Sequence, residues 1–301
     1  MNDNELIYDA STKSGSSGSP IILKNSTKVI GIHKQGHISK TKNYGTCMNY
    51  VLKMLNNSIE FNAKRTYENG EYYIGSMLNN KKHGKGIYYY KNNKILYDGY
   101  FFNDKAEGKG KYFWEDGDYY DGQWKHGMKN GKGILYFNSN NTRYEGNFVN
   151  DKPEGRGKFF FSNGEYYDGE FSNNEINGKG KLYDRNGRIL YDGDFVNGKF
   201  EGKGKYTYEN GNYYDGKWFD DNKHGKGREY YKNGKIKFDG NFVNGEAQGY
   251  GKYIYENGDY YIGHWSKSLK NGEGTLYDMN GNIKLKGKFF NDKLESNCII
   301  I

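Results

Sequence analysis

The chain has 301 residues, of which 34% are hydrophobic and 18% aromatic, and it contains 44 Gly, 32 Tyr and only 2 Pro. Disordered chains are poor in aromatic residues, so this composition excludes disorder and favours many short strands joined by tight turns. The formal net charge is +8, but residues 1–66 hold 9 Lys/Arg against 4 Asp/Glu, and the remainder holds 36 against 33. Most of the chain therefore lacks the one-sided basic excess of a nucleic-acid-binding protein, and no nucleic-acid partner is expected.

Neither the N-terminus nor the cysteines point to a secreted or metal-binding protein. The first residues, "MNDNELIYDAS", have no basic or apolar segment of a signal peptide, and no apolar run approaches the about 18–20 residues of a membrane-spanning helix. Cys47 and Cys298 are too few for a disulfide framework or a zinc site. We therefore expect a cytoplasmic protein with reduced thiols and without metal or cofactor.

Residues 1–55 differ from the rest in composition and have no period. They contain "STKSGSSGSPI", residues 11–21, and then "VIGIH", residues 29–33. This region resembles the nucleophile segment of chymotrypsin-like serine proteases, in particular the glutamyl-endopeptidase branch, in which a Gly-x-Ser-Gly-Ser-Pro loop precedes two strands. The stretch "YGTCMNYVLKML", residues 44–55, resembles the last strand and the C-terminal helix of that family. The resemblance implies a partial trypsin-like β-barrel with a short C-terminal helix.

The resemblance assigns roles to a few residues. Ser17 would be the nucleophile, and the backbone N–H groups of Gly15 and Ser17 would form the oxyanion hole. Thr12 and His33 match the family positions that recognise the carboxylate of a substrate Glu. Ser16 departs from the family, which more often has Asp or Asn there.

The catalytic inventory is incomplete in this chain. Serine catalysis of this kind needs a His base and an Asp that orients it, and in this family both precede the nucleophile. Only 16 residues precede Ser17, and none is His. Because a Ser without a base has an unactivated hydroxyl, we predict a degenerate and inactive fragment. The alternative is a Glu-specific serine endopeptidase whose upstream His/Asp half is missing from this chain or is supplied by another chain.

An internal repeat dominates the chain after a linker at residues 56–66. The pattern aromatic-x-Gly recurs at spacings that alternate between 24 and 23 residues, which gives a unit of 47 residues. Its glycines are Gly75, Gly99, Gly122, Gly146, Gly169, Gly193, Gly216, Gly240, Gly263 and Gly287, with Leu285 in place of the last aromatic. A Gly-x-Gly begins nine residues after each of the first nine. Internal periods of this size indicate a repeat architecture.

Each repeat predicts one β-hairpin. In "YYDGQWKHGMKNGKGILYF", residues 119–137, Tyr120, Gly122 and Trp124 alternate and share one face of a strand. A second strand follows the Gly-x-Gly, and its first inward position is aromatic or Leu in every copy but one, which has Glu229. The strand glycines leave room for a ring or backbone to approach closely. Connections such as "ENGE" and "EDGD" are hairpin signals, and we expect φ > 0 at both of their central positions.

The quoted segment and "YDGDFVNGKFEGKGKYTYENG" resemble MORN repeats, whose hallmark is Tyr-x-Gly-x-Trp/Phe followed by Gly-x-Gly. The resemblance covers residues 67–291, with nine complete copies and a tenth that lacks its Gly-x-Gly. It implies an all-β fold, an elongated single antiparallel meander of about ten hairpins. It also implies a non-catalytic scaffold for protein–protein contacts, dimerisation or cytoskeletal attachment, with a disputed affinity for anionic phospholipids, and hence a location that includes the periphery of membranes or the cytoskeleton.

Two recurring polar positions have alternative interpretations. His83, His126 and His224 occur as "KHG", which we interpret as exposed turn residues rather than ligands. Lysines recur in the Gly-x-Gly and would align into a row along the sheet: Lys85, Lys109, Lys132, Lys179, Lys203 and Lys226. Such a row could contact acidic lipid headgroups, or the nearby Glu107, Glu154 and Glu201 could neutralise it.

Residues 292–301 form a C-terminal tail that ends in "CIII". An open sheet edge invites pairing with another copy, so we expect a tendency to dimerise. The sequence thus predicts a non-catalytic repeat scaffold whose partners are other proteins or a second copy, with an anionic phospholipid surface as a further expectation. A peptide groove lined by the repeat aromatics competes with a purely architectural role for those rings.

Overall fold

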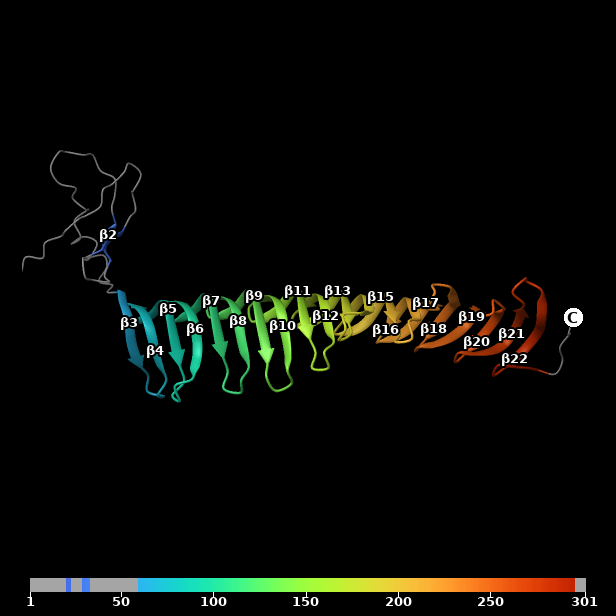
Figure 1. Cartoon of the computed structure of the whole chain (residues 1–301), viewed down its shortest axis with the longest axis horizontal. Helices are drawn as coiled ribbons and strands as arrows, with labels where there is room; N and C mark the ends of the chain where they lie inside the picture. The colour runs from blue at the N-terminus through green and yellow to red at the C-terminus, as the bar shows by residue number, and fades with distance from the viewer. Residues whose placement is uncertain (1–19, 23–28, 33–58, 296–301) are drawn as a thin grey trace, which may run out of the picture. The chain divides into compact units, whose positions relative to one another are not determined.

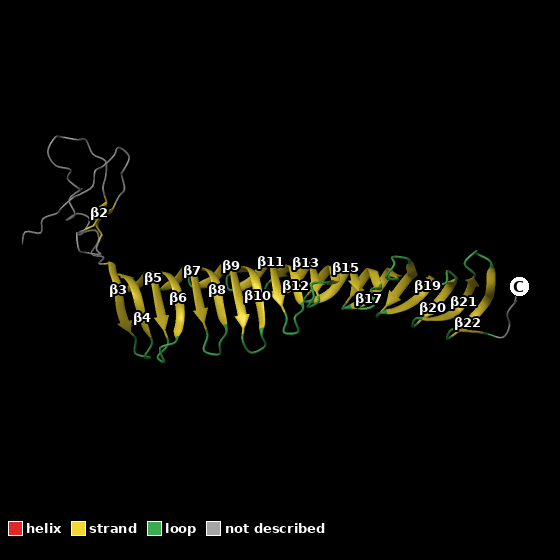
Figure 2. Cartoon of the chain, in the orientation of Figure 1, coloured by secondary structure: helices red, strands yellow, loops and turns green. Residues whose placement is uncertain are grey.

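The computed structural model describes residues 20–22, 29–32 and 59–295, and all regular elements in this part of the chain are strands (Figures 1 and 2). Strands β1 (Pro20–Ile22) and β2 (Val29–Ile32) pair antiparallel. The 21 strands from β3 to β23 form one open antiparallel meander. This confirms the predicted repeat sheet. The helix expected within residues 44–55 lies outside the described residues, and within them no helix is long and apolar enough to cross a membrane.

The chain divides into two compact units, residues 1–129 and 130–301. The sheet strands of the first unit are β3 (Ile59–Thr66), β4 (Tyr72–Leu78), β5 (Lys81–Tyr89), β6 (Ile95–Phe102), β7 (Lys105–Phe113) and β8 (Tyr119–Lys125). Those that follow are β9 (Met128–Phe137), β10 (Thr142–Val149), β11 (Lys152–Phe160), β12 (Tyr166–Ser172), β13 (Glu175–Tyr183), β14 (Ile189–Val196), β15 (Lys199–Thr207), β16 (Tyr213–Phe219), β17 (Asn222–Tyr230), β18 (Ile236–Val243), β19 (Glu246–Ile254), β20 (Tyr260–Ser266), β21 (Leu269–Tyr277), β22 (Ile283–Phe290) and β23 (Lys293–Leu294). Residues 59–66, which the sequence assigns to a linker, form β3 and pair with β4.

The register of each hairpin places two motif glycines opposite each other. In β12 and β13, for example, Gly169 faces Gly180 and Tyr167 faces Leu182. The ring of Tyr167 lies across this glycine pair, and a Cβ atom on Gly180 would come within 2.3 Å of it. The Tyr167 hydroxyl donates to the carbonyl of Glu170 at 3.0 Å. The glycines are therefore required because the tyrosine folds back along its own strand.

These tyrosines and the aromatics two residues after the motif glycine make up the core. The largest fully buried side chains are Tyr73, Tyr120, Tyr144, Tyr167, Tyr191, Tyr214, Tyr261 and Phe148. Tyr167 meets Phe171 of its own repeat at 5.4 Å and Phe195 of the next at 4.9 Å, both edge to face. Because each tyrosine contacts two successive repeats, the core is continuous along the strands of a unit.

The connections between repeats and the short turns within them differ from the expectation in which residues have a positive φ. In "ENGE" only Gly70 has a positive φ, with the Gly70 N–H donating to the carbonyl of Tyr67 at 3.0 Å and the Tyr67 N–H donating to the carbonyl of Glu71 at 2.8 Å. The prediction of two positive φ values there is wrong, because a three-residue connection needs one left-handed residue at its end. Two positive φ values occur instead at the short turn within each repeat, as at Asn79 and Asn80 or Asn173 and Asn174.

Candidate functional site

Two surfaces of the sheet carry side chains that a partner could reach. We call the face that bears the buried motif tyrosines, such as Tyr73 and Tyr167, the tyrosine face. We call the opposite face, which bears the central residue of each Gly-x-Gly, the lysine face. Among the described residues no group of three or more His, Cys, Asp or Glu side chains is placed to hold a metal ion.

The tyrosine face keeps a second set of aromatic rings half-buried rather than buried. They lie on the second strand of each hairpin and just after it: Tyr88, Tyr90, Tyr112, Trp114, Phe159, Phe161, Tyr206, Tyr208, Tyr231, Tyr253 and Tyr255. Neighbouring rings contact one another, as Tyr206 and Tyr208 do at 5.0 Å. This row is an apolar and partly accessible surface over the buried core.

One hollow interrupts this aromatic row in the second unit. It has a volume of about 330 Å³, and its walls include Phe200, Tyr206, Tyr208, Trp218 and Lys223. Burial raises the pKa of Tyr208 to about 12, so its hydroxyl stays protonated at neutral pH. The hollow combines flat aromatic walls with a cationic side chain at its edge.

Lys223 belongs to a set of lysines that lie over the rings of the tyrosine face. The equivalent residues in other repeats include Lys82 and Lys270. The Lys82 amine lies 4.3 Å from the centre of the Tyr88 ring, and burial lowers the pKa of Lys82. Lys223 forms an ion pair with Glu229, and the two side chains are 18 and 20% exposed. Glu229, which departs from the aromatic pattern, supplies a counter-charge for this lysine.

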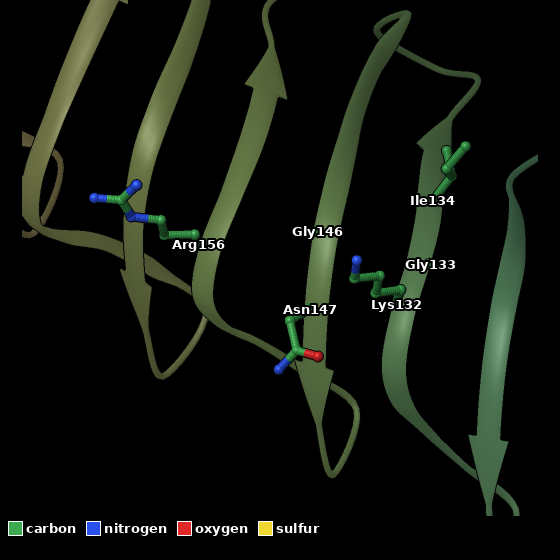
Figure 3. A pocket seen from close by; sticks show the side chains of 6 residues that line it. All are labelled: Lys132, Gly133, Ile134, Gly146, Asn147 and Arg156. Carbon is green, nitrogen blue, oxygen red and sulfur yellow. The ribbon is translucent and has the colours of Figure 1, made fainter.

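The lysine face carries the predicted row of cations. The central residue of every Gly-x-Gly is exposed or half-buried: Lys85, Lys109, Lys132, Arg156, Lys179, Lys203, Lys226, Tyr250 and Glu273. A hollow of about 340 Å³ lies in this row, above Gly133 and Gly146. Figure 3 shows Lys132, Asn147 and Arg156, from three strands, lining it. The small glycine pair leaves the space, and the side chains around it are mostly polar or cationic.

Acidic residues enter the row only in part of the second unit. Arg156 faces Glu170 across β11 and β12, and Lys179 faces Asp194 across β13 and β14. Lys179 and Asp194 form an ion pair at 2.7 Å. The carboxylates of Glu107, Glu154 and Glu201 each accept a hydrogen bond from a backbone N–H in the following repeat, those of His126, Asn173 and Asp220.

Comparison with known families identifies the repeat. Nine segments match the MORN repeat: residues 73–94, 97–119, 120–142, 144–166, 167–187, 191–213, 214–236, 238–260 and 261–283. These segments cover more than half of the chain. The protein belongs to the MORN repeat family.

Other comparisons add little to this assignment. No curated protein matches the chain. Among solved structures, a protein of unknown function from Bacteroides caccae is similar at 12% identity over 93% of both chains, with a TM-score of 0.18. A TM-score this low carries no structural argument.

The MORN repeats place the three "KHG" histidines in two different environments. His126 lies in a short turn, with a φ of 54° and an exposed side chain, as predicted. The prediction is wrong for His83 and His224, which are half-buried in β5 and β17, with each Nδ1 atom buried and without a hydrogen-bond partner among the described residues. Their rings lie beside Phe102 and Phe219, at 5.2 and 5.7 Å. The three tripeptides look alike in the sequence but are not equivalent. Gly84 and Gly225 are the first glycines of a Gly-x-Gly and so lie in a strand, whereas Gly127 lies in the short turn.

The protease-like residues stay predictions. Thr12, Gly15, Ser17 and His33 lie outside the described residues, and the MORN match begins only at residue 73. The strands expected on both sides of the following loop do exist as β1 and β2, with Ile21 opposite Gly31. A single antiparallel pair occurs in many folds, so it does not identify a protease.

Proposed function

We propose that this MORN protein is a non-catalytic scaffold that binds an extended or helical protein segment along its tyrosine face. The observation that carries the proposal is the row of half-buried rings with the aromatic hollow at Phe200, Tyr206, Tyr208 and Trp218. Aromatic side chains often dominate the binding energy of protein interfaces, and here they lie on the second strand of each hairpin or just after it.

The buried core fills the space between repeats, and the half-buried rings that pack over it keep part of their surface accessible for binding. The motif tyrosines and the aromatics after the motif glycine already fill the space between repeats. The second-strand rings cover that core on one side only. Rings of this kind bury further apolar area when a partner covers them, at about 25 cal/mol for each Å² removed from water.

The hollow also suggests what the segment presents. Its aromatic walls accept an apolar side chain, whereas Lys223 at its edge is already paired with Glu229. We therefore expect a bound segment with at least one large apolar residue.

The test is selection of binding peptides from a random displayed library against the full chain, followed by affinity measurements with purified peptides. Tyr208→Ser is expected to weaken the selected peptides at least about tenfold, because it removes one wall of the hollow. Tyr230→Ser is the matched control, since Tyr230 is also half-buried but stacks on Tyr213 on the lysine face at 4.5 Å. Selected peptides that bind both variants equally well, or a failure to enrich any peptide, would contradict the proposal.

A further inference from the structure

A carboxylate-binding arrangement is built into the lysine face of two successive repeats. The first glycine of each Gly-x-Gly has a positive φ, 102° at Gly178 and 62° at Gly202. Glu170 and Asp194 lie over these two glycines, with a carboxylate oxygen 2.1 and 2.7 Å from the place of a Cβ atom. Bulges with a left-handed glycine turn the next N–H out of the ladder, where it can bind an anion.

In both repeats an internal side chain occupies this position. Glu170 accepts a hydrogen bond from the N–H of Lys179 at 3.1 Å, and Asp194 accepts one from the N–H of Lys203 at 3.0 Å. Asp194 also accepts one from the Lys179 amine at 2.7 Å. The amine of Lys179, and then the N–H of Lys203, lower the pKa of Asp194, as expected for a carboxylate held in its charged form.

The following repeat has the same backbone but no carboxylate. Gly225 has a φ of 63°, close to that of Gly202, and the side chain over it is Lys217, whose Cδ atom lies 3.3 Å from the place of a Cβ atom. Lys217 stands directly opposite Lys203 across β15 and β16. Lys226 follows Gly225 on β17. Within the described residues, the amines of Lys203, Lys217 and Lys226 form no ion pair. The backbone N–H of Lys226 likewise has no side-chain acceptor there, unlike the N–H of Lys203.

The nearby acidic residues do not replace the missing carboxylate. Asp239 pairs with Arg228 at 2.8 Å. Asp215 lies two residues before Lys217 on the same face and faces Lys205 and Arg228 instead. Like charges placed directly opposite in a sheet destabilise it, so the lysine cluster of Lys203, Lys217 and Lys226 costs stability in the unbound protein.

We propose that this lysine cluster, together with the N–H of Lys226, binds a carboxylate from an acidic segment of a partner protein. The two preceding repeats show the bound group, a carboxylate on a bulge N–H, and at Asp194 this carboxylate also pairs with a lysine amine. The surroundings fit a protein segment, because exposed apolar side chains flank the cluster on the turn side of the same face: Val196, Phe219 and Val243, which are 48, 57 and 44% exposed. This surface is opposite the tyrosine face, and the inference does not depend on the function proposed above.

The test measures binding of a fluorescein-labelled hexaglutamate peptide to the full chain by fluorescence anisotropy at low and high salt. Lys217→Asp is expected to weaken binding at least about tenfold, because it restores the internal carboxylate found at Asp194. This variant copies an arrangement that the chain already contains at Asp194, and a thermal unfolding midpoint near that of the wild type would show that it folds. Lys235→Asp, in an exposed connection, changes the net charge equally and is expected to retain binding.

A site-specific readout separates this site from a general charge effect. The amide resonance of Lys226 is expected to shift on titration with the peptide in the wild-type chain and not in Lys217→Asp. Equal affinities of Lys217→Asp and Lys235→Asp would overturn the proposal. So would a Lys226 amide that responds to inorganic phosphate or to phosphatidylserine vesicles but not to the peptide, since either result would assign the site to a different anion.

Discussion

At the scale of the residue, one contact explains the hallmark of the repeat. The motif tyrosine needs two facing glycines because its ring occupies the volume that two Cβ atoms would fill. The sequence predicted that the glycines leave room beside aromatic rings, and the structure confirms this. It did not predict that the hydroxyl reaches the carbonyl three residues ahead, as Tyr144 reaches Asn147 at 2.9 Å. That bond depends on a side-chain rotamer, which residue spacing does not encode.

Gly180→Ala tests this contact. The added Cβ atom would lie 2.3 Å from the Tyr167 ring, so the ring must leave its site, and we expect a loss of about 2–3 kcal/mol in the free energy of unfolding by denaturant. Gly187→Ala is the control, because it has a φ of 81° but open space around it, and it should cost only about 1 kcal/mol. If Tyr167→Leu does not relieve the cost of Gly180→Ala in the double variant, the ring is not its cause.

The buried tyrosines also predict a specific response to alkali. Burial raises the pKa of Tyr73, Tyr144, Tyr167 and Tyr261 from 10.0 to about 12. Their folded pKa lies above the unfolded value, so the unfolded chain loses protons first as the pH rises. The stability that these tyrosines contribute is therefore fully present below about pH 10 and is lost between pH 10 and 12. Tyrosinate absorbance and circular dichroism, followed together, should change in step above pH 10; loss of secondary structure well below that pH would contradict this account.

At the scale of the element, hairpins were predictable and their turn types were not. Alternating aromatics and Asn-Gly signals identified strands and connections correctly. The type of the short turn within repeats was not identified because these turns have no common dipeptide: Asn79–Asn80, His126–Gly127 and Lys267–Ser268 are equivalent. What they share is two successive positive φ values, and in most repeats after the first the second turn residue also donates its N–H to the preceding repeat, as Asp104 does to the carbonyl of Lys82 at 3.0 Å.

Lys267 and Ser268 are the least suited pair for such a turn, with φ values of 49° and 64°. Asn and Asp tolerate the left-handed region better than Lys and Ser. The double variant Lys267→Asn, Ser268→Asp should raise the free energy of unfolding by about 1 kcal/mol. Its new carboxylate would retain the acceptor that the Ser268 hydroxyl offers to the N–H of Ala247. The reverse change Asn244→Lys should lower stability by a similar amount. A double variant no more stable than the wild type in denaturant unfolding would refute the explanation.

At the scale of the whole molecule, the two ends of the meander differ from its repeats. The edge strand β3 was missed by the sequence because it carries no repeat pattern. At the other end β23 has only two residues, and within the described chain it pairs with β22 through Phe289 and Phe290 alone. The rest of β22 is an edge that β23 does not pair with. Pairing with a second copy stays a proposal, and β22 is the strand through which we expect it.

The edge of β22 bears Lys284, Lys286 and Lys288, of which Lys284 pairs with Asp259 and Lys288 with Glu295. Lysines on an edge strand oppose pairing, and antiparallel pairing centred on Lys286 would place it opposite its copy. We therefore expect self-association, measured by light scattering at tens of micromolar, to increase with salt and to increase further in Lys286→Thr. A monomer under all these conditions would show that β22 is not a contact between copies.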